Sequence, residues 1–212
     1  MNMYIYAFGS LCRGEIALDS DIDLLAITDG YDERLNKNVF SIYSCTRIQE
    51  IWEEGNPFSW HLYSESKLIY SCTGFDFIKS LGMPNEYKKG IDDCKKFYSL
   101  FIESLTSIEK YGANVFELST IFLAIRNIAT CYSLFVNQQL IFSRNSALLI
   151  KENNIKISHQ CYEILKRSRI LSVRGEGEII SDFEFDIVHN ELSAIGNWME
   201  KILSEVMQHG RI

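Results

Sequence analysis

The stretch Tyr6-Ala7-Phe8-Gly9-Ser10 is followed, about ten residues later, by Asp19-Ser20-Asp21-Ile22-Asp23-Leu24, and this pair of segments decides the fold. Residues i and i+2 of a β-strand point to the same face, so a strand here places the carboxylates of Asp21 and Asp23 side by side. Two like charges this close repel each other unless a cation lies between them. Carboxylate oxygens on a rigid strand suit Mg²⁺, which usually binds together with substrate phosphates.

Gly9 and Ser10 form a small turn between the two apolar runs. A glycine lets the backbone turn tightly, and such a turn offers N–H groups and a hydroxyl to phosphate oxygens. The pattern therefore predicts a site for a metal and a phosphorylated ligand. The alternative interpretation is an ordinary loop that leads through an acidic turn into a buried strand.

The segment Phe8-Gly9-Ser10-Leu11-Cys12-Arg13-Gly14-Glu15, together with Ser20-Asp21-Ile22-Asp23-Leu24, resembles the signature of the DNA polymerase β-like nucleotidyltransferase superfamily. Its minimal and kanamycin-type members are the most similar. The resemblance implies that Asp21 and Asp23 hold two Mg²⁺ ions and that Gly9 and Ser10 bind the triphosphate of an NTP. Ser20 and Arg13 are further candidates for nucleotide binding, with a surface role as the alternative for Arg13.

The family also uses a third carboxylate on a later strand, and here the sequence departs from the pattern. The strand expected at residues 38–44 contains no Asp or Glu. Glu65 is the candidate third catalytic residue, and His61 is the other candidate substitute. The alternative is that Glu65 is solvated near a turn and that His61 is structural.

The hydrophobic pattern predicts an α+β protein in which a small mixed-sheet domain, residues 1–74, precedes an all-α helical bundle, residues 75–212. A period of two predicts strands, and a period of three to four predicts helices. The predicted strands are 3–7, 22–28, 38–44, 58–63 and 67–70, with a short helix around residues 48–52. The main predicted helices are 87–108, 115–135, 157–171 and 184–207. This layout is similar to that of kanamycin-type enzymes, and to a minimal nucleotidyltransferase joined to a HEPN-like bundle.

Basic residues in the helical part offer other candidate sites. Arg126-Asn127 matches the start of the HEPN ribonuclease motif, but no His stands at residues 131–133, which argues against that activity. Ser143-Arg144 and Lys166-Arg167-Ser168-Arg169 either line a path for an anionic ligand or form a solvated basic helix face. The second run, with Arg174, is the best candidate for a local basic patch.

Composition restricts the class of protein further. The chain has 212 residues and a net charge of −7, which argues against broad affinity for nucleic-acid backbone. The six cysteines include no Cys-x-x-Cys pair, so neither a zinc site nor a disulfide framework is expected. No apolar run reaches the length of a membrane span, and the N-terminus lacks signal-peptide features. We therefore expect a cytoplasmic protein without a membrane partner.

The sequence as a whole predicts an Mg²⁺-dependent nucleotidyltransferase. It would transfer NMP, with AMP from ATP as the favoured choice, to a hydroxyl of a protein, an RNA or a small molecule. A role in a toxin–antitoxin or phage-defence system is one setting, and antibiotic modification is another. The alternative from a different class is a degenerate nucleotidyltransferase that binds NTP as a regulatory module. The acceptor stays open, as does the formation of a homo-oligomer.

Overall fold

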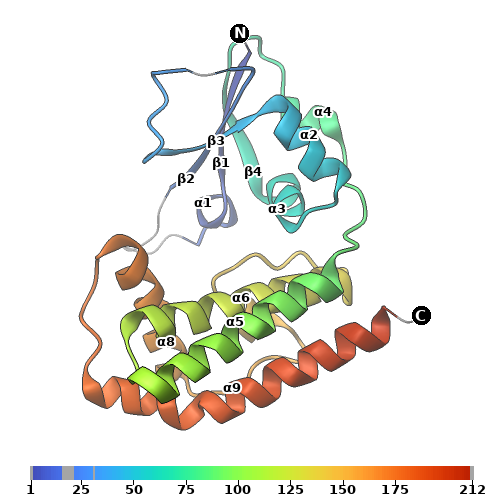
Figure 1. The fold of residues 1–212 in the computed structure, drawn as a ribbon. Coiled ribbons are helices and arrows are strands. Elements are labelled where there is room, and N and C mark those ends of the chain that lie inside the picture. Colours follow the sequence, from blue (N-terminus) through green and yellow to red (C-terminus); the bar gives the residue numbers. More distant parts are fainter. Residues whose placement is uncertain (1, 16–21, 31, 211–212) are drawn as a thin grey trace. The chain divides into compact units, whose positions relative to one another are not determined.

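A computed structural model describes residues 2–15, 22–30 and 32–210 of the chain. The chain divides into two compact units, Met1–Lys88 and Lys89–Ile212. The first unit contains the sheet and the second is helical, so the α+β class and the order of the two parts are as predicted (Figure 1).

A four-stranded mixed sheet forms the centre of the first unit. Its strands are β1 (Met3–Phe8), β2 (Asp23–Thr28), β3 (Phe40–Ser44) and β4 (Ser66–Ser71), in the spatial order β3-β2-β1-β4. Strand β1 runs antiparallel to β2 and β4, whereas β2 and β3 are parallel. The antiparallel pairing puts the last residue of β1, Phe8, opposite Asp23, the first residue of β2, so the two signature segments meet at the ends of the two central strands.

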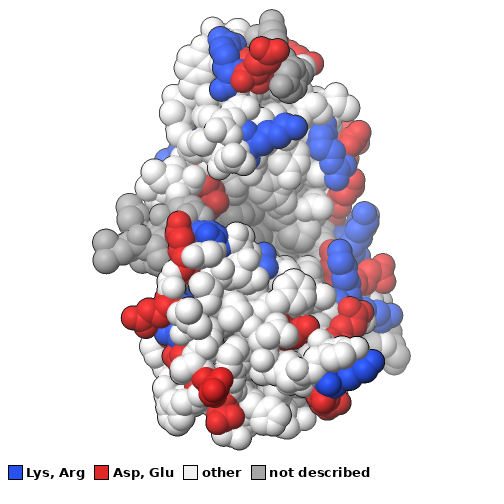
Figure 2. Space-filling view, turned by 60° about the vertical axis from the view of Figure 1, so that its left-hand side comes forward, with Lys and Arg blue, Asp and Glu red and all other residues white. Residues whose placement is uncertain are grey.

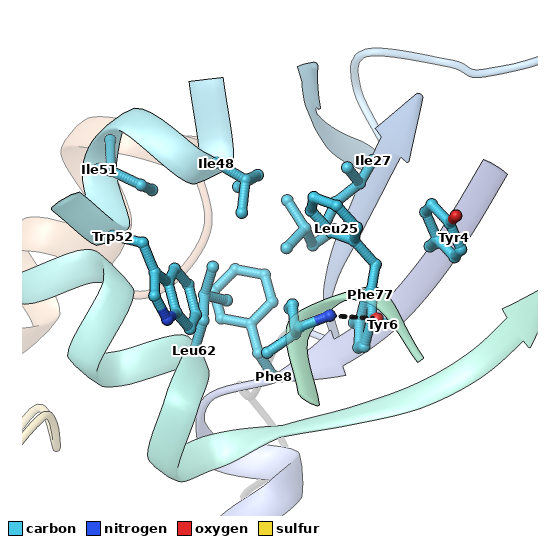
Figure 3. Packing of buried hydrophobic residues seen from close by; sticks show 11 residues of the cluster. Tyr4, Tyr6, Phe8, Leu25, Ile27, Ile48, Ile51, Trp52, Leu62 and Phe77 are labelled. Atoms are coloured by element: carbon cyan, nitrogen blue, oxygen red, sulfur yellow. Dashed lines mark hydrogen bonds between the residues drawn. The ribbon is translucent and has the colours of Figure 1, made fainter. Parts of the chain in front are cut away.

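One face of this sheet carries the core of the unit. Side chains at alternate positions, among them Tyr6, Leu25 and Ile27, pack against Ile48 and Leu62 from the helices that cover this face (Figure 3). These helices are α2 (Cys45–Glu53), α3 (Pro57–Glu65) and α4 (Phe77–Leu81), and a short helix, α1 (Ser10–Arg13), follows β1. Because successive strand residues alternate between faces, Asp23 shares the face of Leu25 and Ile27.

The strand predicted at residues 58–63 is wrong, because these residues belong to helix α3. The side chain of Asn56 accepts a hydrogen bond from the backbone N–H of Phe58, and Pro57 is the first helical residue. An Asn N-cap followed by Pro is a recognised helix start, since Pro lacks only an N–H that the first turn does not need. The segment is also rich in aromatic residues, which are common in strands.

The first unit ends at Lys88 rather than at residue 74, the boundary that the sequence favoured. The hydroxyl of Tyr6 donates to Asp76 Oδ1 at 2.9 Å and accepts from the backbone N–H of Ile78 at 3.0 Å. Phe77 stacks on Tyr4, with ring centroids 5.3 Å apart. Helix α4 is therefore part of the core of the sheet unit, although its periodicity resembles that of the helical part.

The second unit consists of helices packed around a central helix. They are α5 (Gly90–Tyr111), α6 (Val115–Phe135), α7 (Ser146–Leu149), α8 (His159–Arg174) and α9 (Asp182–His209). Helix α6, whose bounds equal those predicted, packs against all four others. By length and composition it is apolar enough to cross a membrane, contrary to the expectation that no such run exists. However, 72% of its most apolar window is buried in the structure, as in the core helix of a folded protein.

Candidate active site

The Gly-Ser turn joins β1 to α1, and a positive φ of 74° at Gly9 makes this turn possible. The carbonyl oxygen of Gly9 accepts from the backbone N–H of Cys12 at 3.0 Å and of Arg13 at 3.2 Å. Gly14, with φ of 75°, ends the helix. The backbone at Gly9 lies in the region that glycine enters at little cost, so the turn depends on this residue.

The carboxylate of Asp23 lies directly on this turn. A Cβ atom added to Gly9 would lie 2.8 Å from Asp23 Oδ2, closer than such contacts occur. The structure thus brings together Gly9, Ser10 and Asp23, three of the predicted site residues. Asp21 and Ser20 lie outside the described residues, so their predicted roles remain predictions.

The donors present suit a hard divalent cation. Asp23 supplies carboxylate oxygens beside a turn that only glycine accommodates, and Mg²⁺ prefers such oxygens. Within the ranges that the structure describes, no three His, Cys, Asp or Glu side chains are grouped to hold a metal ion. The predicted partner of Asp23 in this role is Asp21, from the segment outside those ranges.

Glu65 ends helix α3 beside the turn and contacts it in two ways. Its carbonyl oxygen accepts from the backbone N–H of Gly9 at 3.2 Å. Its carboxylate forms an ion pair with Arg13, and His61 Nε2 lies 2.9 Å from Glu65 Oε2. Arg13 also donates from Nε to Glu15 Oε2 at 2.9 Å. The structure therefore gathers all three sequence candidates, with Arg13 on α1 and with His61 and Glu65 on α3, where a strand was expected.

The surroundings of Glu65 keep its carboxyl group ionised. Burial alone would raise its pKa, but the hydrogen bond and charge of His61, together with the charge and hydrogen bond of Arg13, bring the pKa below its ordinary value. A carboxylate with a lowered pKa is a weaker proton acceptor. Geometry and charge thus suit Glu65 to orienting Arg13 and the turn better than to accepting a proton.

Strand β3 supplies no acid to the site. It reads Phe-Ser-Ile-Tyr-Ser, and Tyr43 on the core face packs against the apolar cluster.

Lys67, which the sequence analysis did not single out, lies on β4 opposite Ala7. Its charge lowers the pKa of Cys12, although burial raises that pKa more strongly. A cation therefore stands near the turn. Its only signal in the sequence is its place, two residues after Glu65.

One protein family matches part of the chain. The family model of the nucleotidyltransferase domain matches residues 3–82. No curated protein sequence matches the chain. Among solved structures, a spectinomycin adenyltransferase from Enterococcus faecialis, crystallised with ATP and spectinomycin, is similar at 12% sequence identity and a TM-score of 0.46, over 94% of this chain and 92% of that one.

The matched range contains the whole sheet, the Gly-Ser turn, both signature aspartates and α4. It ends well beyond residue 74, in agreement with the core contacts of Tyr6. Residues 3–82 are therefore a nucleotidyltransferase domain of the DNA polymerase β-like superfamily.

Proposed function

We propose that the protein transfers NMP, with AMP favoured, from an NTP to an acceptor hydroxyl. The carboxylate of Asp23 seated on the Gly9-Ser10 turn is the observation that supports this proposal. Such an arrangement holds a nucleotide triphosphate and a metal-binding carboxylate within reach of each other. Besides these two components, nucleotidyl transfer requires that the acceptor oxygen be aligned with the α-phosphate.

Each residue of the site has a defined role in this proposal. Asp21 and Asp23 would hold the Mg²⁺ ions, which when bound stabilise the attacking and leaving oxygens of the transfer. Gly9 and Ser10 bind the triphosphate through the turn. Glu65 fixes Arg13 and the backbone of Gly9, so that the turn keeps its shape in the absence of substrate.

Loss of the aspartates is the direct test. Full-length protein is incubated with Mg²⁺ and ATP labelled at the α-phosphate, and label transfer is followed on RNA, on protein and on small hydroxyl compounds including spectinomycin and kanamycin. Because metal stabilisation is worth several kcal/mol, Asp23→Asn and Asp21→Asn should each lower transfer by about 10³-fold. Asp32→Asn is the matched control, since Asp32 pairs with the exposed Arg34, outside the proposed site. Unchanged transfer by the double variant would contradict the proposal.

A second candidate function is NTP binding without turnover. It is favoured by the absence of Asp and Glu from β3 and by the engagement of the Glu65 carboxylate with Arg13 and His61. Metal-dependent ATP binding without pyrophosphate release, across the same acceptors, would support this function over transfer.

The distribution of charge bears on the class of acceptor. In the view of Figure 2, basic side chains stand beside acidic ones, with no continuous basic surface on that face. Together with the net charge of −7, this argues against long contact with nucleic-acid backbone on that face. We therefore propose that any RNA acceptor is held through a short local site. The label-transfer experiment described above distinguishes RNA from protein and antibiotic acceptors.

A further inference from the structure

The basic run of helix α8 is engaged within the helical unit. Lys166 Nζ donates to Glu163 Oε1 at 2.7 Å, and Arg167 Nη2 donates to Glu184 Oε1 at 2.5 Å. Arg169 instead reaches a serine hydroxyl of α6, 3.4 Å from its Nη1. Two cations of this run are thus neutralised by carboxylates of their own unit. The sheet unit holds a cation of a different kind, near the Gly-Ser turn.

The side chains already placed around the Gly-Ser turn are mostly acidic. The carboxylate of Asp23 lies directly on the turn, and Glu15 and Glu65 both pair with Arg13. The single positive charge of Arg13 is therefore offset by two carboxylates. A triphosphate at this turn would be repelled by the remaining negative charge, so further cations are needed to balance it.

The pairing of β4 with β1 places Lys67 beside the turn. The two strands are antiparallel, with Lys67 opposite Ala7. The backbone N–H of Gly9 continues this pairing, because it donates to the carbonyl oxygen of Glu65 at 3.2 Å. Lys67 therefore follows closely the point at which β4 meets the turn, on a strand about 4.8 Å from β1.

The charge of Lys67 is available to a ligand. Its side chain is exposed, and over the residues that the structure describes it forms no ion pair with a carboxylate. Burial raises the pKa of Cys12 on α1, and the charge of Lys67 opposes that rise, so the ammonium group lies within electrostatic reach of α1. Helix α1 begins at Ser10, in the turn itself. The flexible four-carbon stem of lysine lets the ammonium group move toward a ligand bound there.

Lys67 and Asp23 stand on opposite sides of β1. In the spatial order β3-β2-β1-β4, the strand of Asp23 and the strand of Lys67 flank β1 and the turn that follows it. In the proposed transfer, the metal held by Asp23 acts at the α-phosphate, where the acceptor attacks. A triphosphate that begins at Asp23 and crosses the turn brings its β- and γ-phosphates toward Lys67.

We propose that Lys67 binds the terminal phosphates of the NTP. The identity of the ligand rests on the proposed function, but the contact can be measured by binding alone, without transfer. A lysine binds phosphate as a point charge, which suits a contact made from an exposed, flexible side chain.

Binding of ATP and of AMP to the full chain in the presence of Mg²⁺ tests this role. Calorimetry gives the affinity for ATP, and competition with ATP gives that for AMP. Lys67→Gln should weaken ATP binding about fivefold to tenfold, as expected for the loss of one charge-assisted contact at an exposed site. AMP lacks the terminal phosphates and should bind this variant and the unsubstituted protein equally.

Two further variants serve as controls. Lys67→Arg keeps the positive charge and should retain most of the affinity for ATP. Lys79→Gln removes an exposed charge of the same unit, on α4, and should change the affinity for neither nucleotide. Circular dichroism of each variant confirms that it is folded.

Equal affinity for ATP in Lys67→Gln and in the unsubstituted protein would overturn the proposal. An equal loss of ATP and AMP affinity would do the same, because the effect would then not depend on the terminal phosphates. Absence of ATP binding by the unsubstituted protein overturns it as well. Label transfer separates this proposal from the proposed function. If ATP binding depends on Lys67 as expected but no label is transferred, the role of Lys67 stands and transfer does not.

Discussion

The backbone N–H of Gly9 donates to the carbonyl oxygen of Glu65 at 3.2 Å, so the end of α3 holds the Gly-Ser turn through main-chain atoms. The Glu65 carboxylate adds a second attachment through Arg13, on the helix that follows the turn. Side-chain changes at Glu65 therefore remove only one of two supports, and changes at Gly9 act on the turn itself.

Gly9→Ala should abolish nucleotidyl transfer. A side chain here is strained by a φ of 74° with a ψ of −139°, at a cost of about 1–3 kcal/mol, and its Cβ would displace Asp23, which it meets at 2.8 Å. Gly14→Ala is the matched control, because its φ is 75° but nothing lies within 4 Å of the added Cβ. Because Gly14 lies in the left-handed helical region, with ψ of 14°, this variant should lose only about 1 kcal/mol of the free energy of unfolding and retain transfer. Equal activity in the two variants would show that Asp23 need not contact the turn.

Glu65→Gln should destabilise the protein in a manner that depends on pH. Because the pKa of Glu65 in the folded protein is held below its ordinary value of 4.5, its stabilising contribution is fully present above that pH and is lost as the pH falls through the lowered pKa. The difference in free energy of unfolding between the two proteins, measured with urea, should thus be largest above pH 4.5 and shrink below it. Glu50→Gln, in an exposed pair with Arg47, should show a difference within about 1 kcal/mol and little change with pH.

Tyr6→Phe should loosen helix α4 from the sheet. The substitution removes the hydroxyl that bonds Asp76 and the backbone N–H of Ile78, and leaves that N–H buried without its acceptor, at about 1–3 kcal/mol. Thermal unfolding and the rate of proteolysis between residues 76 and 88 report the effect. Tyr70→Phe, at an exposed tyrosine of β4, should change neither. Unaltered proteolysis in Tyr6→Phe would contradict the placement of α4 in the first unit.

Two glycines of the helical unit should respond oppositely to alanine. In Gly90→Ala the new Cβ would lie 2.2 Å from the ring of Phe135, so overpacking should lower stability by about 1–3 kcal/mol. In Gly196→Ala the new Cβ meets Phe101 at 3.5 Å, an ordinary contact, and the better helix propensity of alanine should raise stability by about 0.5–1 kcal/mol. Chemical denaturation measures the free energy of unfolding of both variants. The prediction is contradicted if this free energy changes in the same direction in both.

Local patterns in the sequence predicted much of the fold. Periodicity predicts the strands 3–7 and 22–28 and the helix 115–135. The spacing of apolar residues along a strand or helix reflects which of its faces are buried. The strand predicted at residues 58–63 is a helix, because the Asn56-Pro57 helix start is only a two-residue signal and aromatic residues such as those of this segment are common in strands. The boundary at residue 74 shifted because the partner of α4 is Tyr6, some 70 positions away in the chain.

The sequence by itself determined the family of the first unit and the place of its turn at Gly9 and Ser10. Both follow from a signature that consists of particular residue types at fixed short spacing. Only the tertiary structure decided that Glu65 binds Arg13 and His61, since the pairing requires the end of α3 to return to β1. It alone also separated Arg169 from Lys166 and Arg167, which have carboxylate partners. Charge neutralisation depends on which side chains meet in space, and spacing along one helix does not contain that information.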